Sequence, residues 1–334
     1  MQRECLSIAV ILTVAAGCDN VAWEGVELRL RPPTSPAILS SEETNISPDQ
    51  IEDDPAPRAP IRPILFSGQR TGPIATLTAV GEVAGNSLLG IPNQNLQFET
   101  PSALDLAGVT KDSEWILFSE GVRIGRMVAQ EVWIDERYCT PRPAISGRVE
   151  LVSEATNVEH LIALPNAFSA SRSFKQYTAH RHNYNQRVAS LTLASEAITD
   201  FGAEWPISLL NSRADINTFQ LVGEDSRTIA ATFVYQDQMT ISPPQEPEAY
   251  SLFVMGSESS GTYGATYVSY RPTESQGKGV PRYIDHIDWN GDGAEEILLE
   301  IFGSENRWFA GLAKKEGRWT QSFEDRCNRS TLVK

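Results

Sequence analysis

The sequence has little that would bind nucleic acid or cross a membrane. Lys and Arg number 28 against 43 Asp and Glu, which gives a net charge of −15, and no dense basic block interrupts this acidic background. Because a phosphate backbone attracts positive charge, we expect no nucleic acid partner. No apolar run in the sequence reaches the roughly 18 residues that a membrane-spanning helix needs.

The motifs of several enzyme classes are also missing. The sequence contains no G-x-S-x-G nucleophile elbow, no H-E-x-x-H zinc motif, no phosphate-binding glycine loop and no C-x-x-C pair. Enzymes that use a pair of carboxylates carry no such motif, so this class is not excluded. In that case Asp285, His286 and Glu295 are the best catalytic candidates. His180 and His182 have the spacing of two metal ligands on a strand, but their polar neighbours favour a loop.

The remaining composition is that of a folded chain. The protein has 334 residues, of which 41% are hydrophobic and 21% charged. This length allows about two domains of roughly 150 residues each, and the hydrophobic content is high enough to build a core in each.

The first 18 residues, MQRECLSIAVILTVAAGC, predict export. Arg3 precedes an apolar stretch of 11 residues, Leu6–Ala16, which is long enough for a signal peptide and too short for a membrane span. Gly17 and Cys18 follow, and the segment resembles a bacterial lipoprotein signal. The resemblance implies removal of residues 1–17, a lipid on Cys18 and an envelope location facing the periplasm or the cell surface. Ordinary cleavage, which would release a secreted protein, is the alternative.

Two cysteines remain for the folded part of the chain. Cys5 would leave with the signal peptide and Cys18 would carry lipid, so Cys139 and Cys327 form an even pair. Because exported proteins meet an oxidising compartment, we predict a disulfide between them, with two unpaired thiols as the alternative.

Residues 18–63 predict a solvated tether between the lipid and the folded part. This stretch holds eight of the 20 prolines, and its acidic residues outnumber its arginines. Proline removes backbone donors and like charges repel, so we expect an extended chain here.

The rest of the sequence predicts a mainly β fold (α+β class) with antiparallel sheets in two parts, a β-rich domain over 64–185 and a helix followed by a meander over 186–334. Apolar residues at three- and four-residue intervals, including Val188, Leu191 and Phe201, predict a helix ending near Gly202, and Pro206 predicts a short second helix through Leu210. No strand–helix alternation and no repeat appears, which disfavours a doubly wound sheet and a multi-blade propeller. The expected strands are Ile74–Val80, Trp115–Phe118, Val122–Trp133, Ile145–Val152, Thr218–Val222, Thr228–Tyr235, Tyr250–Met255, Thr262–Tyr270, Arg282–Ile287, Glu295–Phe302, Arg307–Ala313 and Arg318–Phe323.

One segment, DWNGDGAEE at 288–296, carries metal chemistry. Asp288, Asn290 and Asp292 alternate before Gly293, where a calcium-binding loop turns sharply, and Glu296 follows at the ninth position. The twelfth position is not a Glu, so the segment departs from an EF-hand. It resembles instead the calcium hairpins of FG-GAP and VCBS-type repeats, which implies calcium bound by these four side chains and the Ala294 carbonyl, with a structural role. The alternative is that Asn-Gly and Asp-Gly simply form a good hairpin turn.

Five aromatic residues surround this segment, and we expect them to be core residues rather than a ligand platform. They are Trp289, Phe302, Trp308, Phe309 and Trp319. Taken together, the sequence predicts an exported, membrane-anchored binding or structural module with a protein or glycan partner at the envelope. An exported hydrolase is the alternative.

Overall fold

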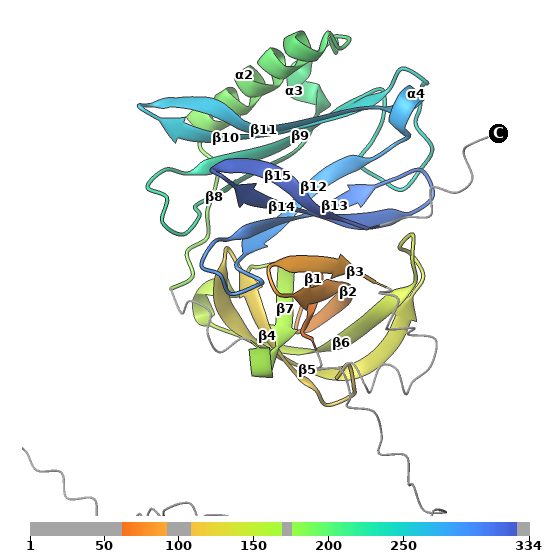
Figure 1. The fold of residues 1–334 in the computed structure, drawn as a ribbon, viewed down its shortest axis with the longest axis vertical. Coiled ribbons are helices and arrows are strands. Elements are labelled where there is room, and N and C mark those ends of the chain that lie inside the picture. The colour runs from red at the N-terminus through yellow and green to blue at the C-terminus, as the bar shows by residue number, and fades with distance from the viewer. Residues whose placement is uncertain (1–61, 92–107, 169–175, 326–334) are drawn as a thin grey trace, which may run out of the picture. The chain divides into compact units, whose positions relative to one another are not determined.

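The structure is a computed structural model that describes residues 62–91, 108–168 and 176–325, all of which belong to one compact unit, residues 59–334. Its strands form three antiparallel sheets (Figure 1). The predicted mainly β fold, antiparallel and without a propeller, is confirmed. Among the helices of the described ranges, none is long and apolar enough to span a membrane.

The first sheet closes into a barrel. Six strands follow one another in the order β1, β7, β4, β5, β6 and β2, and β2 pairs back with β1, so this ring of strands has no free edge. The short strand β3 extends the sheet as a hairpin partner of β2. The strands are β1 (Ile64–Thr71), β2 (Ile74–Ala84), β3 (Ser87–Gly90), β4 (Glu114–Ser119), β5 (Val122–Asp135), β6 (Arg142–Leu151) and β7 (His160–Pro165), with short 3-10 turns at Ser153–Ala155 and Asn166–Phe168.

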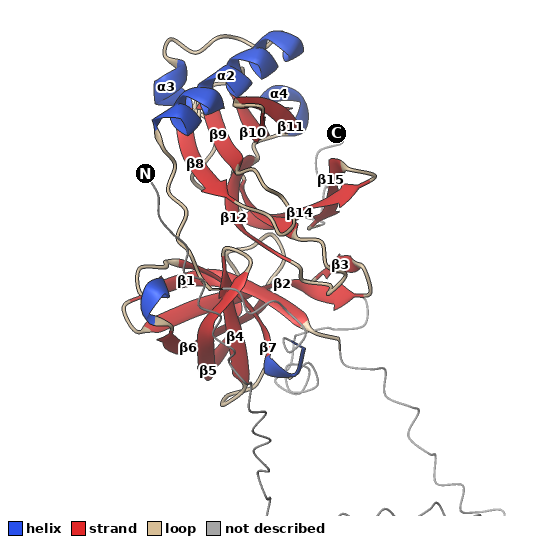
Figure 2. Ribbon diagram, turned by 90° about the vertical axis from the view of Figure 1, so that its left-hand side faces the viewer, coloured by secondary structure: helices blue, strands red, loops and turns tan. Residues whose placement is uncertain are grey.

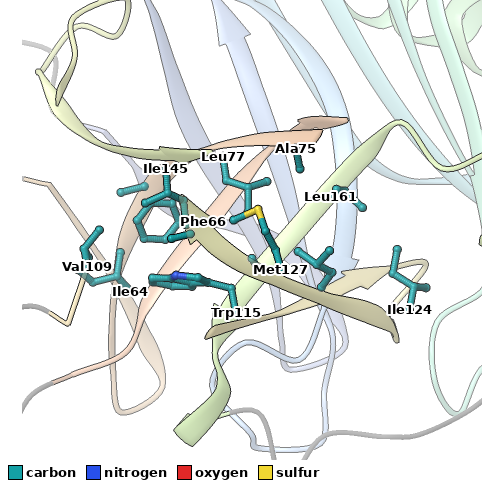
Figure 3. Close-up of a cluster of buried hydrophobic side chains, with 14 of the residues drawn as sticks. Ile64, Phe66, Ala75, Leu77, Val109, Trp115, Ile124, Met127, Ile145 and Leu161 are labelled. Atoms are coloured by element: carbon teal, nitrogen blue, oxygen red, sulfur yellow. The ribbon is translucent and has the colours of Figure 1, made fainter. Parts of the chain in front are cut away.

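Large apolar side chains fill the barrel. Phe66, Leu77, Trp115 and Met127 come from four different strands, and each is at most 1% exposed (Figure 3). The rings of Phe66 and Trp115 meet edge to face with their centroids 4.6 Å apart. The barrel interior is therefore a packed core.

Two strand glycines allow the barrel strands to approach one another closely. A Cβ atom on Gly68 would lie 1.9 Å from the carbonyl oxygen of Thr76, and one on Gly125 would lie 2.1 Å from that of Glu150. Because no side chain fits at these distances, only glycine permits the tight coiling that so small a barrel requires.

The C-terminal half contains the other two sheets, of four strands each. One has the order β11-β10-β9-β8 and the other has the order β12-β13-β14-β15. The elements are α2 (Tyr184–Phe201), α3 (Leu209–Ser212), β8 (Arg213–Phe219), β9 (Thr228–Tyr235), β10 (Tyr250–Ser259), β11 (Thr262–Pro272), α4 (Thr273–Gln276), β12 (Val280–Ile287), β13 (Glu296–Phe302), β14 (Arg307–Lys315) and β15 (Arg318–Glu324).

The β12–β15 sheet is covered on both faces. Side chains such as Leu298 and Phe309 pack against the barrel residues Ile116 and Phe118, whereas Ile297 and its neighbours on the opposite face pack against the β8–β11 sheet. All seven residues of β13 are consequently buried, which explains why this strand carries apolar residues on both faces, apart from Glu296 and Glu300, rather than alternating with polar ones.

Helix α2 lies on the other face of the β8–β11 sheet (Figure 2). Asn183 begins it with a capping box formed with Gln186, and Gly202 ends it in the left-handed conformation, as predicted. The predicted apolar face was partly wrong, since Val188 and Phe201 are 43% and 51% exposed. Leu193 lies over Gly256 of β10 instead, and this close approach turns the helix so that Leu193 and its neighbours face the sheet.

The predicted strand positions are otherwise close, with two corrections. The second helix begins at Leu209 rather than Pro206, because Ser208 provides the side-chain cap. Strand β8 covers Arg213–Phe219 and not Thr218–Val222, because the backbone N–H of Val222 leaves the sheet to donate to Glu295 at 2.7 Å. Strands β1, β3 and β7 were not delimited from the sequence.

Candidate ligand-binding site

A polar cavity of about 270 Å³ lies where the barrel meets the β12–β15 sheet. Strands β1, β2 and β7 and the loop after β5 supply one side, and strands β12, β13 and β14 supply the other. The lining residues are Ser67, Gly68, Gln69, Thr71, Thr76, Thr78, Arg137, Tyr138, His160, Arg282, Ile284, Glu300, Arg307 and Phe309. Hydroxyl groups and arginines dominate this set, although the chain as a whole is strongly acidic.

The first of the three arginines is neutralised by its own carboxylate. Arg137 donates to both oxygens of Asp135, at 2.9 and 2.8 Å, in a bidentate pair. Asp135 also accepts from the Thr78 hydroxyl at 3.2 Å. Burial would raise the pKa of Asp135, but the hydrogen bonds and charge of Arg137 outweigh it and lower that pKa overall.

The other two arginines share one carboxylate. Glu300, on the buried strand β13, is 2% exposed and pairs with Arg282 on one oxygen and with Arg307 on the other, the latter at 2.9 Å. Tyr138 donates its hydroxyl to the same carboxylate at 3.2 Å. Two guanidinium groups and one carboxylate leave one positive charge in excess at the cavity wall.

Three buried nitrogen atoms at the cavity lack hydrogen-bond partners within the described ranges. They are Nε of Arg282, Nε of Arg307 and Nδ1 of His160. Burial lowers the pKa of His160, and the positive charge of Arg282 lowers it further. At neutral pH we therefore expect an uncharged imidazole beside the two arginines.

The three residues that the sequence favoured for catalysis lie together but outside this cavity. His286 Nδ1 is 3.5 Å from Asp285 Oδ1, and His286 Nε2 is 3.9 Å from Glu295 Oε2. All three are at most 9% exposed. Burial lowers the pKa of His286 to about 3 and raises that of Asp285 well above its ordinary value.

A turn of the barrel covers this group. The backbone N–H of Glu120, in the β4–β5 turn, donates to both oxygens of Asp285 at 3.0 and 3.1 Å. A Cβ atom on Gly121 would lie 2.2 Å from Glu295 Oε1 and 3.1 Å from His286 Nε2, so only glycine fits there. The group therefore joins two layers of the molecule and offers no room for a substrate.

The 288–296 segment forms the loop between β12 and β13, and its side chains bind the loop's own backbone. Asp288 accepts from the N–H groups of Gly291, Asp292 and Gly293 at 2.6 to 3.1 Å. Asn290 accepts from Asp292 at 2.8 Å and donates to Glu296 at 2.6 Å, and Asp292 accepts from the N–H of Ala294 at 2.9 Å.

This donor set has the chemistry that calcium prefers. In the described part of the chain, no group of three or more His, Cys, Asp or Glu side chains is arranged to hold a metal ion. Glu296 is buried, and burial followed by the charges of Asp292 and Asp288 raises its pKa to about 8. Calcium at this loop stays a prediction.

The remaining predicted residues are the cysteines and the aromatic residues near the loop. Cys18 and Cys327 lie outside the described residues, so the lipid and the disulfide stay predictions. Cys139 packs against the cluster between the two C-terminal sheets, and its N–H donates to the carbonyl of Arg307 at 3.0 Å. The five aromatic residues near the loop, Trp289, Phe302, Trp308, Phe309 and Trp319, are all buried, as expected of core residues.

One feature of the sequence, which belongs to no known motif, could have indicated the cavity. Glu300 interrupts an apolar strand, and an ionised group in a fully buried strand needs a cationic partner. Arg282 stands directly opposite it on β12. Arg307 begins the next strand of the meander, β14, which pairs with β13. His160 comes from β7 of the barrel, and only the packing of the barrel on the sheet brings it to the cavity.

Comparisons with known proteins give no further guide. No family model matches this sequence, and no curated protein or solved structure is significantly similar to it. The function is therefore argued from the site.

Proposed function

We propose that this protein is a lipid-anchored binding protein of the bacterial envelope whose ligand occupies the cavity between the barrel and the β12–β15 sheet. One observation carries the proposal: a concave, polar site with arginines at its wall lies at the junction of the barrel and the β12–β15 sheet. Ligand sites favour such junctions, where a few charged groups fix the ligand's orientation.

The same geometry favours binding over hydrolysis. A general acid or base must come within hydrogen-bond distance of the bond that reacts. Asp285, His286 and Glu295 lie beneath the β4–β5 turn, and the carboxylate at the cavity, Glu300, is held by two arginines. An exported hydrolase is the second candidate function, and it would need acid–base groups other than these.

The location is proposed from the sequence. A lipid on Cys18 and the acidic, proline-rich stretch 18–63 would hold the folded part away from the membrane, facing the periplasm or the cell surface. Cells grown with a radiolabelled fatty acid should label the natural chain and not a Cys18→Ser variant. Equal labelling of both chains would contradict the anchor.

We also propose that the β12–β13 loop binds calcium in a structural role. Asp288, Asn290, Asp292, Glu296 and the Ala294 carbonyl would supply the oxygens, and the ion would offset the repulsion among the carboxylates. The loop joins β12 and the fully buried β13, so an ion there would stabilise the central sheet.

Filling the cavity tests the binding function. Thr76→Trp places a large side chain in it from β2, whereas Val128→Trp adds the same group at an exposed position of β5. The melting temperature of the full chain is measured with a panel of small polar compounds. A ligand at 100 times its Kd stabilises by about 2.7 kcal/mol, and we expect this in the natural chain and Val128→Trp but not in Thr76→Trp. Equal stabilisation of Thr76→Trp, or none in any chain, contradicts the proposal.

A further inference from the structure

We infer that the cavity binds a small hydroxylated monocarboxylate, the chemical class of a sugar acid, with its carboxylate held by Arg282 and Arg307. This inference rests on the proposed binding function and names its ligand class. It follows from the charge, the hydrogen-bonding groups and the size of the cavity.

The charge balance calls for one negative charge. Arg137 is matched by Asp135, but among the described residues the ion pairs of Arg282 and Arg307 both go to Glu300. Asp215 also lies near Arg282, but burial raises the pKa of its carboxyl group and so disfavours the charged form. Their side chains are only 20% and 18% exposed, so water solvates the excess charge poorly. With a bound carboxylate, two negative charges would balance the two guanidinium groups.

A phosphate would not balance the site as well. A phosphate monoester carries a charge of about −1.5 to −2 at pH 7, and beside Glu300 it would leave net negative charge in a buried place. His160 cannot compensate, because burial and Arg282 both lower its pKa. The balance therefore favours a singly charged carboxylate.

The hydrogen-bonding groups fit an anion with hydroxyl groups. The Nε atoms of Arg282 and Arg307 and the Nδ1 atom of His160 are buried without partners in the described ranges. Guanidinium groups present planar pairs of donors that match a carboxylate. Thr71 and Thr76 of strands β1 and β2 line the same cavity and can both donate to and accept from ligand hydroxyls.

The size limits the ligand to roughly one sugar unit. At about 270 Å³, the cavity falls just below the range of about 300 to 1,000 Å³ that holds drug-sized ligands. The rings of Tyr138 and Phe309 stack on each other at its wall with their centroids 4.9 Å apart and are only 5% and 1% exposed, so they close the cavity and limit its size.

Calorimetric titration of the full chain tests the inference. The probes are glucuronate, galacturonate and gluconate, with glucose as the neutral control and glucose 6-phosphate as the dianionic one. We expect at least one sugar acid to bind at least about tenfold more tightly than both controls, since a charge-assisted hydrogen bond is worth about 1.5 to 3 kcal/mol. Arg307→Gln should weaken that binding by about tenfold or more, while Arg318→Gln, the same change at an exposed position of β15, should not.

A second variant keeps the test decisive if Arg307→Gln lowers the melting temperature. Arg307→Lys keeps a positive charge beside Glu300 but lacks the planar pair of donors that matches a carboxylate, so affinity for the sugar acid should still fall while the melting temperature is retained. Equal binding of glucose and glucuronate, with Thr76→Trp still abolishing both, would overturn the carboxylate assignment and leave the binding function intact. Failure of every sugar acid to bind would overturn the assignment as well, and the wider panel with Thr76→Trp would then decide the binding function separately.

Discussion

Two ion pairs inside the described part of the fold are matched one to one. Arg142 and Asp325 lie 2.9 Å apart with side chains 0% and 2% exposed, and Lys278 and Asp237 lie 2.7 Å apart with side chains 0% and 3% exposed. Because an unpaired buried charge costs several kcal/mol, such matching is what allows these residues inside the fold. The two arginines on Glu300 depart from it, and this departure is the residue-level basis of the proposed site.

The Arg142–Asp325 pair gives a direct test of this matching. Asp325→Ala leaves the fully buried Arg142 without its carboxylate and removes the acceptor of the Phe309 N–H. We expect the free energy of unfolding, measured by urea denaturation, to fall by about 3 to 5 kcal/mol. Glu150→Ala, which breaks the exposed pair with Arg126, should change it little because water screens that pair. Equal effects of the two substitutions would contradict the assignment.

The pKa of His160 measures the effect of burial and of nearby positive charge at the cavity. Its pKa should lie below the ordinary 6.5, because burial and then Arg282 disfavour the charged ring. The unfolded chain then binds a proton more readily than the folded one. The stabilisation from His160 is therefore full above about pH 6.5 and is lost as the pH falls below it.

Arg282→Gln removes the second of these causes and should raise the pKa of His160. An NMR titration of the four histidines measures this, and the signal of His160 is assigned by its loss in His160→Gln. A midpoint that does not move in Arg282→Gln would show that the arginine's charge does not reach the ring.

At the scale of elements, the β12–β13 hairpin connects the layers. Its strands lie between the barrel and the β8–β11 sheet, and Asp285 near its end accepts hydrogen bonds from the barrel turn at Glu120. The loop that joins the two strands therefore closes a hairpin that contacts both neighbouring layers. Loss of the hydrogen bonds that Asp288 accepts from the loop backbone should therefore lower the free energy of unfolding of the whole unit.

Calcium binding at this loop is tested by melting in calcium and in a chelator. If the ion binds, the natural chain should melt at a higher temperature in calcium than in chelator, and Asp292→Ala should melt at the same temperature in both. Identical melting of the natural chain in the two conditions contradicts calcium binding. Asp288→Ala should be destabilised in both conditions, because Asp288 accepts three backbone N–H bonds whether or not an ion is present.

The barrel strands depend on close approach at glycine. Gly125→Ala on β5 would force a methyl group to 2.1 Å from the carbonyl oxygen of Glu150, so we expect a loss of about 1 to 3 kcal/mol in the free energy of unfolding. Gly264→Ala on β11 is the matched control, because nothing lies within 4 Å of the added methyl. Similar denaturation midpoints for both variants would contradict the account of barrel coiling.

At the scale of the whole molecule, charge is distributed unevenly. The chain carries a net charge of −15, yet three arginines line one cavity. An acidic exterior repels anions in general, so an anionic ligand needs local compensation to bind at all. The arginines provide it at one place between two layers.

Apart from β8, the sequence predicted the strands of the C-terminal half closely, because each is an apolar run or an alternating segment with turn residues at its ends. Strand β9, for example, covers Thr228–Tyr235 as expected. The barrel was not predicted, because its closure requires β1 to pair not only with its neighbour β2 but also with β7, which lies about 90 residues later in the chain. The cavity was missed for the same reason: His160 and Arg282 meet only after the barrel and the sheet have packed together.

The most direct test of the central claim is to map where a sugar acid binds on the full chain. Glucuronate, or whichever of the three sugar acids binds most tightly, is titrated while the backbone amide NMR signals are followed. We expect the signals that shift to belong to strands β1 and β2 and to residues 282, 300 and 307 at the cavity. Shifts confined to the surface of α2 and α3, with the cavity signals unchanged, would contradict the account.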